Sequence, residues 1–204
     1  DQAQQPAVWV SGFYGSGKSH LVKMLRALWV DTAFEDGATA RGIAHLPQAI
    51  RDSLHELDVQ ARRHGGLHAV SGTLGAGASG SVRLALLRLI FKSVGLPEQY
   101  PVARFVMWLR HEGIQERVRG LVESQGCDWD EELDNFYVAE SLHAALMECK
   151  PNVFSSLGSC AETLNNLYPY VTDVSSDEML KVMRQALSKD GQMPLTLIVL
   201  DEVQ

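Results

Sequence analysis

The stretch Gly12-Phe13-Tyr14-Gly15-Ser16-Gly17-Lys18-Ser19 matches the pattern GxxxxGK[ST] at every specified position. The short apolar run 7–10 precedes it and predicts a buried strand, and apolar residues at helical spacing predict a helix that begins at Lys18. Glycines let such a loop bend so that successive backbone N–H groups point into one concavity, to which the helix N-terminus adds partial positive charge. The pattern therefore predicts a phosphate-binding loop, the Walker A motif, between a strand and a helix.

The residue types of the loop indicate a nucleoside triphosphate. Lys18 is expected to reach the β- and γ-phosphates as a mobile charge, and the Ser19 hydroxyl is expected to complete the shell of a Mg²⁺ ion. The alternative is a glycine-rich turn followed by a chance Lys-Ser pair, and it requires five specified positions to match by coincidence. The residues expected to bind the nucleotide are Gly12, Phe13, Tyr14, Gly15, Ser16, Gly17, Lys18, Ser19 and His20.

A second signal is the apolar run 195–200, which has strand length and is followed directly by Asp201 and Glu202. An aspartate at the carboxyl end of a strand beside the phosphate loop can hold Mg²⁺, so Asp201 and Ser19 are the predicted metal ligands. Glu202 is expected to orient and deprotonate the water that attacks the γ-phosphate. The run thus has the features of a Walker B motif, and the predicted catalytic residues are Lys18 and Glu202.

The sequence also narrows the kind of P-loop protein. It has no Asn-Lys-x-Asp stretch, which a GTPase uses to read the base, and no Leu-Ser-Gly-Gly-Gln signature of transporter ATPases. A small-molecule kinase has less use for a glutamate that activates water. The remaining class is an additional-strand ATPase of the broad AAA+/STAND kind, with ATP and Mg²⁺ as its ligands, and the predicted strand 67–74 lies between the two motifs as that class requires.

The hydrophobic periodicity predicts an α/β fold, in which a parallel sheet is flanked by helices. A largely α-helical insertion is expected between the second strand and the Walker B strand. The expected ATPase core spans about 7–94 and 190–204, and the insertion spans about 100–189. Helices are expected from residue 18 and over 47–64, 81–94, 101–111, 114–124, 130–148, 152–167 and 175–188, and strands over 7–10, 67–74 and 195–200.

Composition excludes several broad classes. With 204 residues, 46% apolar and 21% charged, the chain is not disordered, collagen-like or coiled-coil, and one domain of ordinary size is expected. No apolar run approaches the roughly 18 residues that span a bilayer, and a secretory signal layout is lacking. We therefore expect a soluble, cytoplasmic protein without membrane contact.

The net charge of −7 is unevenly distributed along the chain. Residues 1–82 carry 7 basic and 7 acidic side chains, residues 83–119 carry 7 and 3, and residues 120–204 carry 4 and 15. This balance does not indicate general nucleic-acid binding, which depends on many Lys and Arg contacts to phosphates. Segment 83–119 leaves two interpretations open: a solvated helix surface balanced by the acidic segment, or a DNA-contact surface that uses Arg110, Arg117 and Arg119.

A weaker signal is the stretch 75–80, which spells GxGxxG after a predicted strand and before a predicted helix. A dinucleotide site also needs an acidic residue at the end of a strand about twenty positions on, and only Glu98, in a Leu-Pro-Glu loop, stands there. A close-packed turn is the preferred interpretation, and a lining of the nucleotide site or of a polymer groove is the alternative.

The region 9–25, with its Ser-Gly-Phe-x-Gly-Ser-Gly-Lys-Ser-His start, resembles the P-loop ATPases of bacterial BREX phage-defence systems, of the BrxC/PglY type. The stretches 71–77 and 199–204 are similar to the same family, so the likeness covers about forty residues. The resemblance implies an N-terminal ATPase segment of a longer multidomain protein that restricts phage DNA with other defence-system components. Contact with DNA through the full-length protein and homo-oligomers are further expectations.

The family's longer chains also imply that sensor and arginine-finger residues lie beyond Gln204. We therefore expect the 204-residue segment to bind nucleotide weakly and to hydrolyse it poorly, while ATP hydrolysis in the full-length protein drives conformational change. The alternative is a nucleotide-gated scaffold or DNA-binding switch with little turnover, which recruits partners through the helical segment.

Overall fold

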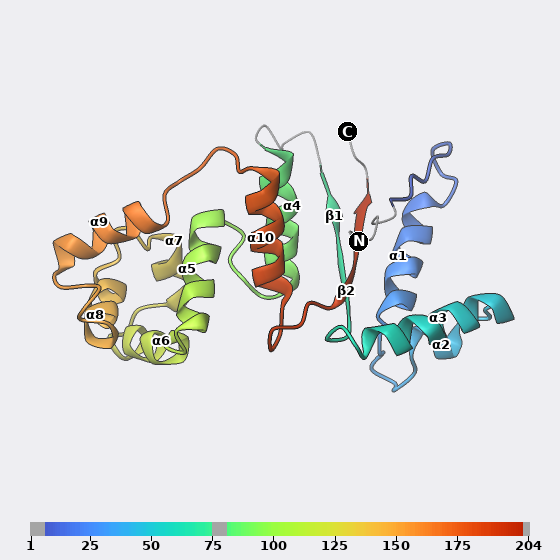
Figure 1. The fold of residues 1–204 in the computed structure, drawn as a ribbon, viewed down its shortest axis with the longest axis horizontal. Helices are drawn as coiled ribbons and strands as arrows, with labels where there is room; N and C mark the ends of the chain where they lie inside the picture. Colours follow the sequence, from blue (N-terminus) through green and yellow to red (C-terminus); the bar gives the residue numbers. More distant parts are fainter. Residues whose placement is uncertain (1–6, 75–80, 202–204) are drawn as a thin grey trace. The chain divides into compact units, whose positions relative to one another are not determined.

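The structure is a computed structural model of the chain, and it describes residues 7–74 and 81–201 (Figure 1). The fold is mixed α/β and mostly helical, with a two-stranded parallel sheet packed against helices. The described residues divide into two compact units. We call residues 7–74 and 189–201 the α/β unit, and residues 81–188 the helical unit.

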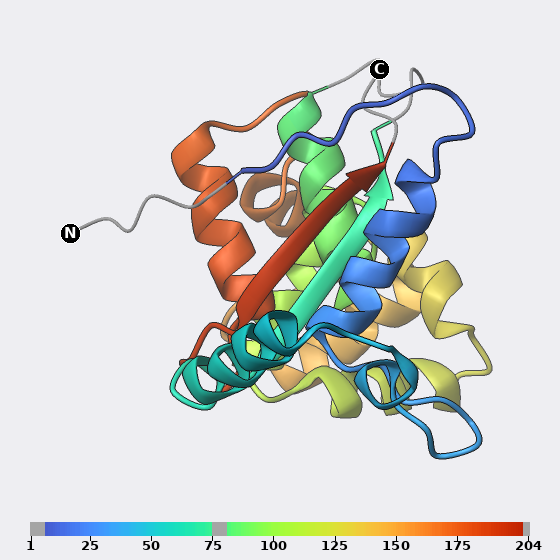
Figure 2. The ribbon, with the colours of Figure 1, turned by 90° about the vertical axis from the view of Figure 1, so that its right-hand side faces the viewer.

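The α/β unit is built around strands β1 (Leu67–Thr73) and β2 (Leu195–Asp201), which run parallel (Figure 2). Their register pairs Leu67 with Leu195 and Thr73 with Asp201, so both strands end at the same edge. Three helices complete the unit: α1 (Lys18–Trp29), α2 (Ala40–Ile43) and α3 (Gln48–Ala61). The structure confirms the strands expected over 67–74 and 195–200 and the helices expected from residue 18 and over 47–64. Helix α2 was not expected, because its 4 residues are too few to show a helical repeat.

Helix α1 lies along the sheet in the direction opposite to the strands. Near its start, the Ser19 hydroxyl donates a hydrogen bond of 3.1 Å to Asp201 at the end of β2. At its end, the Trp29 indole N–H donates a bond of 3.3 Å to the carbonyl of Leu195, where β2 begins. The first bond joins the start of α1 to the end of β2, and the second joins the end of α1 to the start of β2. The start of α1 is therefore held at the carboxyl edge of the strands.

A double glycine turn joins α3 to β1. Gly65 and Gly66 have φ angles of +75° and +97°, in the region that glycine adopts without steric cost. A Cβ atom on Gly65 would lie 3.1 Å from Cβ of Gln192, so the 65–66 turn also approaches the turn before β2 closely. The expectation that Gly65-Gly66 ends the second helix is confirmed.

The strand expected over 7–10 is wrong. These residues have no strand conformation, and Val8 and Trp9 are 85% and 77% exposed, so Trp9 is not a core residue either. A strand requires hydrogen bonds from a neighbouring strand, and among the described residues β1 and β2 pair only with each other. An apolar, β-rich composition alone is therefore not enough to make residues 7–10 a strand.

The helical unit contains seven helices within the described residues. Ser81 caps the first of them by accepting hydrogen bonds from the N–H groups of Arg83 and Leu84, and α4 packs against α10 (Figure 1). The helices are α4 (Val82–Ser93), α5 (Tyr100–His111), α6 (Gln115–Ser124), α7 (Trp129–Asp134), α8 (Glu140–Cys149), α9 (Leu157–Leu167) and α10 (Ser176–Leu187). Helix α4 falls in the helical unit, and the ATPase core expected from the sequence extends to about residue 94.

Two of the expected helix boundaries in this unit are wrong. The helix expected over 130–148 is broken between α7 and α8, because Phe136 turns into the core, where it is 1% exposed and stacks on Phe105. The helix expected from 152 begins at Leu157, because Ser156 and Ser159 form a reciprocal capping box there. Both features depend on local side-chain partners that periodicity does not reveal.

Phe105 lies at the centre of the helical unit's aromatic core. Its ring centroid lies 5.5 Å from that of Phe136, 5.7 Å from that of Tyr168 and 6.2 Å from that of Trp108. Ring pairs at these distances contribute about 0.5–1.5 kcal/mol each beyond the burial of their area. Across the two described ranges, every helix is too short or too polar to traverse a lipid bilayer.

Candidate functional site

The loop 12–17 leads into α1 without a side-chain cap. Gly15 and Gly17 have φ angles of +78° and +85°, which only glycine adopts readily, and the N–H of Ser16 closes a turn onto the carbonyl of Phe13 at 3.1 Å. Gly17 is the N-cap of α1, and no acidic residue stands in the first helical turn. Within residues 7–74 and 81–201, the N–H groups at the start of α1 therefore have no carboxylate or cap side chain to satisfy them, which favours an external anion.

Lys18 folds back over the loop in this structure. Its ammonium group donates hydrogen bonds of 2.8 Å to the carbonyls of Gly12 and Phe13. If the Lys18 ammonium group is to reach the phosphates, a bound triphosphate must compete with these two neutral carbonyl acceptors. Charged phosphate oxygens are the stronger acceptors, because hydrogen bonds between two ionised groups are about twice as strong as neutral ones.

Ser19 and Asp201 are brought together from positions 182 residues apart in the chain. The 3.1 Å bond joins the Ser19 hydroxyl to Oδ1 of Asp201, and both residues are half-buried. Helix α1 positions the serine in its first turn, and the parallel register positions the aspartate at the carboxyl edge of the sheet. Two hard oxygen ligands thus lie next to the phosphate loop.

This oxygen pair suits a magnesium ion shared with phosphates. Mg²⁺ keeps several waters and is usually bound by one or two carboxylates together with substrate phosphates. Within residues 7–74 and 81–201, no cluster of three or more His, Cys, Asp or Glu side chains could hold a metal by itself. Ser19 and Asp201 therefore fit a metal that arrives with a nucleotide, rather than a structural metal.

The structure describes some of the remaining predicted site residues but not Glu202. Phe13 and Tyr14 are 92% and 105% exposed at the tip of the loop, and His20 is exposed on α1. Glu202, the predicted catalytic base, lies outside the described residues, as does the glycine-rich stretch 75–80. The described residues therefore include the predicted phosphate loop and the predicted metal-ligand pair, but not the residue expected to activate water.

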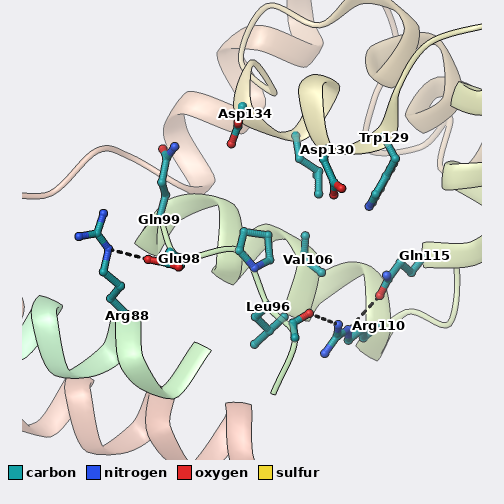
Figure 3. Close-up of a pocket in the computed structure, with 13 residues that line it drawn as sticks. Arg88, Leu96, Glu98, Gln99, Val106, Arg110, Gln115, Trp129, Asp130 and Asp134 are labelled. Carbon is teal, nitrogen blue, oxygen red and sulfur yellow. Dashed lines mark hydrogen bonds and ion pairs between the residues drawn. The ribbon is translucent and has the colours of Figure 1, made fainter. Parts of the chain in front are cut away.

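The helical unit has a separate pocket of about 450 Å³ between α5, α7 and the 95–99 segment (Figure 3). Leu96, Val106 and Leu133 supply apolar lining, and Trp129 stands at one side. Arg88 at the pocket pairs with Glu98 at 3.1 Å, and Arg110 donates to the carbonyl of Gly95 at 3.0 Å. The guanidinium groups of Arg88 and Arg110 are thus engaged by the protein, and none of the residues predicted for the nucleotide site lines this pocket.

The basic side chains of segment 83–119 are neutralised almost throughout by acidic neighbours. Of the three arginines expected to form a DNA surface, Arg117 pairs with Glu148 at 3.1 Å and Arg119 with Glu123 at 2.7 Å, whereas Arg110 has no carboxylate partner in the described part of the chain. The other pairs are Arg83 with Asp173, Arg88 and Lys92 with Glu98, and Arg104 with Glu178. These contacts favour the interpretation of a balanced helix surface.

No protein-family model matches the chain, and no solved structure gives a significant match to it. The case for a function therefore rests on the residues and their geometry.

Sequence reasoning missed two features that shape this site. The Trp29 bond to Leu195 fixes the far end of α1, and the self-contact of Lys18 sets the resting position of the lysine. The spacing of Trp29 at the end of an amphipathic helix suits a packed residue, and only the structure shows that its indole N–H has a partner. No sequence signal could have revealed the lysine contact, because it depends on the path of the loop.

Proposed function

We propose that the chain is an ATP-binding domain of a P-loop NTPase that binds MgATP and, in the full-length protein, hydrolyses it. The proposal includes the finer fold: an ATPase core with an α-helical insertion between β1 and β2. The single observation that carries it is the hydrogen bond between Ser19, in the GKS sequence, and Asp201, at the end of an apolar strand. Two motifs identified independently in the sequence meet at the point where a shared metal would bind.

The proposed chemistry is electrostatic positioning. The N–H groups of the loop and of the first turn of α1 bind phosphate oxygens, and Lys18 leaves its two carbonyl partners to contact the β- and γ-phosphates. Ser19 and Asp201 hold Mg²⁺, which supplies neutralising charge for the phosphates. Glu202 accepts the proton of the attacking water as the general base.

The likeness to BREX phage-defence ATPases supports a wider role for the whole protein. Hydrolysis would drive conformational change in a multidomain protein that acts with other defence components against phage DNA. Paired charges along segment 83–119 give no support to that segment as the DNA-contact surface. Partners and oligomeric state are part of this wider proposal.

Equilibrium binding of a fluorescent ATP analogue with magnesium tests the core proposal. Lys18→Ala is expected to weaken binding at least about 100-fold, since it removes a desolvated contact between charges. Lys23→Ala is the matched control, because Lys23 is an exposed lysine on the same helix. Equal affinities for the two variants, or no binding by the unaltered chain, would contradict the proposal.

Turnover separates an ATPase from a nucleotide-gated scaffold. In the full-length protein, Glu202→Gln is expected to leave MgATP binding within about twofold and to lower kcat by at least about 100-fold, because a general base contributes about 10²–10⁴ to rate. An unchanged kcat would exclude the assigned role of Glu202 and favour the switch.

A further inference from the structure

Seven of the eight basic side chains of the α/β unit form no salt bridge within the described residues, and four of the seven lie at one edge of the sheet. Arg26, Arg62, Arg63 and Lys189 are exposed, and none of them forms a salt bridge within the described residues. This unit carries 8 basic and 8 acidic residues, so the lack of pairing does not follow from an excess of basic residues.

These four residues come from three segments that meet at the amino end of the strands. The carbonyl of Gly66 accepts a hydrogen bond of 3.0 Å from the N–H of Leu195, which links the turn after α3 to the start of β2. Trp29, one helical turn after Arg26, donates to the carbonyl of the same Leu195. The close approach of Gly65 to Gln192 brings the Lys189 turn to the same place.

The electrostatics of His68, near the start of β1, give independent support for this convergence. Burial lowers the pKa of His68, and the positive charges of Lys189 and Arg26 lower it further. Both charges therefore act on one imidazole, although they lie far apart in sequence. We call Arg26, Arg62, Arg63 and Lys189, with His64 beside them, the basic end of the sheet.

Nearby acidic residues offset part of this charge. Asp58 is already paired with Arg41 at 2.7 Å, but Asp31, which accepts a bond of 2.9 Å from the neutral backbone N–H of Arg41, keeps its negative charge. Asp190, next to Lys189, is the remaining acid in the turn before β2. Part of the positive charge complements the C-terminal dipole ends of α1 and α3, but each such end carries only about half a charge.

We propose that the basic end of the sheet binds the phosphate backbone of duplex DNA, at the edge opposite the phosphate loop. Three of its four permanent charges are arginines, whose planar forks suit phosphate oxygens, and they form an array that a polyanion engages together. The described stretches 51–74 and 189–201 expose no large apolar side chain, whereas Met24 and Leu25, beside Arg26 on α1, are each 45% exposed. Three of the four basic residues therefore stand on segments without the apolar anchors that a membrane surface or a protein partner would need.

Fluorescence anisotropy of a labelled duplex of arbitrary sequence with the 204-residue chain tests this surface. If about three phosphates are neutralised, raising salt from 50 to 200 mM is expected to lower the affinity about 40-fold. The double variant Arg62→Gln with Arg63→Gln is expected to reduce that salt dependence to about 3- to 4-fold and to weaken binding at least tenfold in 50 mM salt. Glutamine keeps the polar character and helix propensity of the side chain without its charge, and a melting curve confirms folding.

The matched control is Arg117→Gln with Arg119→Gln, which removes the same charge from paired arginines of the helical unit. We expect this control to change DNA affinity less than about twofold. Equal losses for the two double variants, no binding by the unaltered chain, or binding to anionic phosphatidylserine vesicles without binding to DNA would each overturn the proposal. Lys18→Ala is expected to leave DNA binding unchanged, which separates this site from the nucleotide site.

Discussion

The two units differ in how they use their apolar residues. Among the described residues, 24 apolar side chains are buried in the helical unit and 6 in the α/β unit, although the predicted chemistry belongs to the second. Helix α1, which follows the predicted phosphate loop, has no buried residue, and Leu21, Met24 and Leu25 are 45–49% exposed along it. Most of the buried apolar side chains therefore lie in the helical unit, whereas the predicted nucleotide site lies in the α/β unit.

This contrast indicates that the site is positioned by a few directional bonds rather than by a large core. Ser19 to Asp201 and Trp29 to Leu195 hold α1 on β2, where a denser unit would rely on apolar packing. Regions with few buried apolar contacts open locally at a lower free energy than the global transition. We expect the α/β unit to be the less stable one, and four changes test the contrast from the largest effect to the smallest.

The largest effect is expected from Phe105→Ala in the helical unit. Phe105 is fully buried and contacts three aromatic rings, so its loss should lower the free energy of unfolding by about 3–5 kcal/mol. Leu25→Ala on the half-exposed face of α1 should cost less than about 1 kcal/mol. Urea denaturation followed by circular dichroism measures both, and similar costs would remove the contrast between the units.

Gly17→Ala is expected to have the next largest effect. Its φ of +85° is strained for alanine, so the loop should either shift or lose about 1–2 kcal/mol. MgATP affinity should fall about tenfold or more while the helical unit keeps its melting transition. Gly120→Ala is the control, because Gly120 lies inside α6 without a positive φ, and alanine is the better helix former there. Unaltered MgATP affinity in Gly17→Ala would show that the loop conformation is not required.

Trp29→Phe tests the far end of α1. The change removes the indole donor to the Leu195 carbonyl and should destabilise the α/β unit by about 1 kcal/mol. Hydrogen exchange should then quicken in β2 and α1 before it quickens in α4 or α10. Uniform acceleration across both units would show that they unfold as one cooperative structure.

The smallest effect concerns acid pH and the helical unit. Hydrogen bonds from Arg83, then Ser81, lower the pKa of Asp173 from 3.8 to about 2. A carboxylate with a depressed pKa stabilises the folded state above its unfolded pKa, and this contribution is lost as the pH falls from about 4 through about 2. Asp173→Asn should flatten the pH dependence of the melting temperature in that range, and an unchanged slope would contradict the assignment.

The sequence predicted most elements because their signals are local. Periodicity identified α1, α3, α4 and the two strands within a few residues, and the motif spacing anticipated that Ser19 and Asp201 would be neighbours. The prediction failed where residues distant in the sequence determine the local structure. Residues 7–10 lack a neighbouring strand among the described residues, and Phe136 interrupts the expected helix to enter the core. The basic end of the sheet was missed for the same reason, because its residues are up to 163 positions apart.

The most direct test of the account is the magnesium dependence of ATP binding, measured by isothermal titration calorimetry for the unaltered chain, Ser19→Ala, Asp201→Asn and the double variant. We expect magnesium to tighten ATP binding about tenfold or more in the unaltered chain and each single change to remove that gain. The double variant should be no worse than the singles, because the two residues act through one ion. A magnesium effect that persists in both single variants would contradict the claim that Ser19 and Asp201 form a metal site.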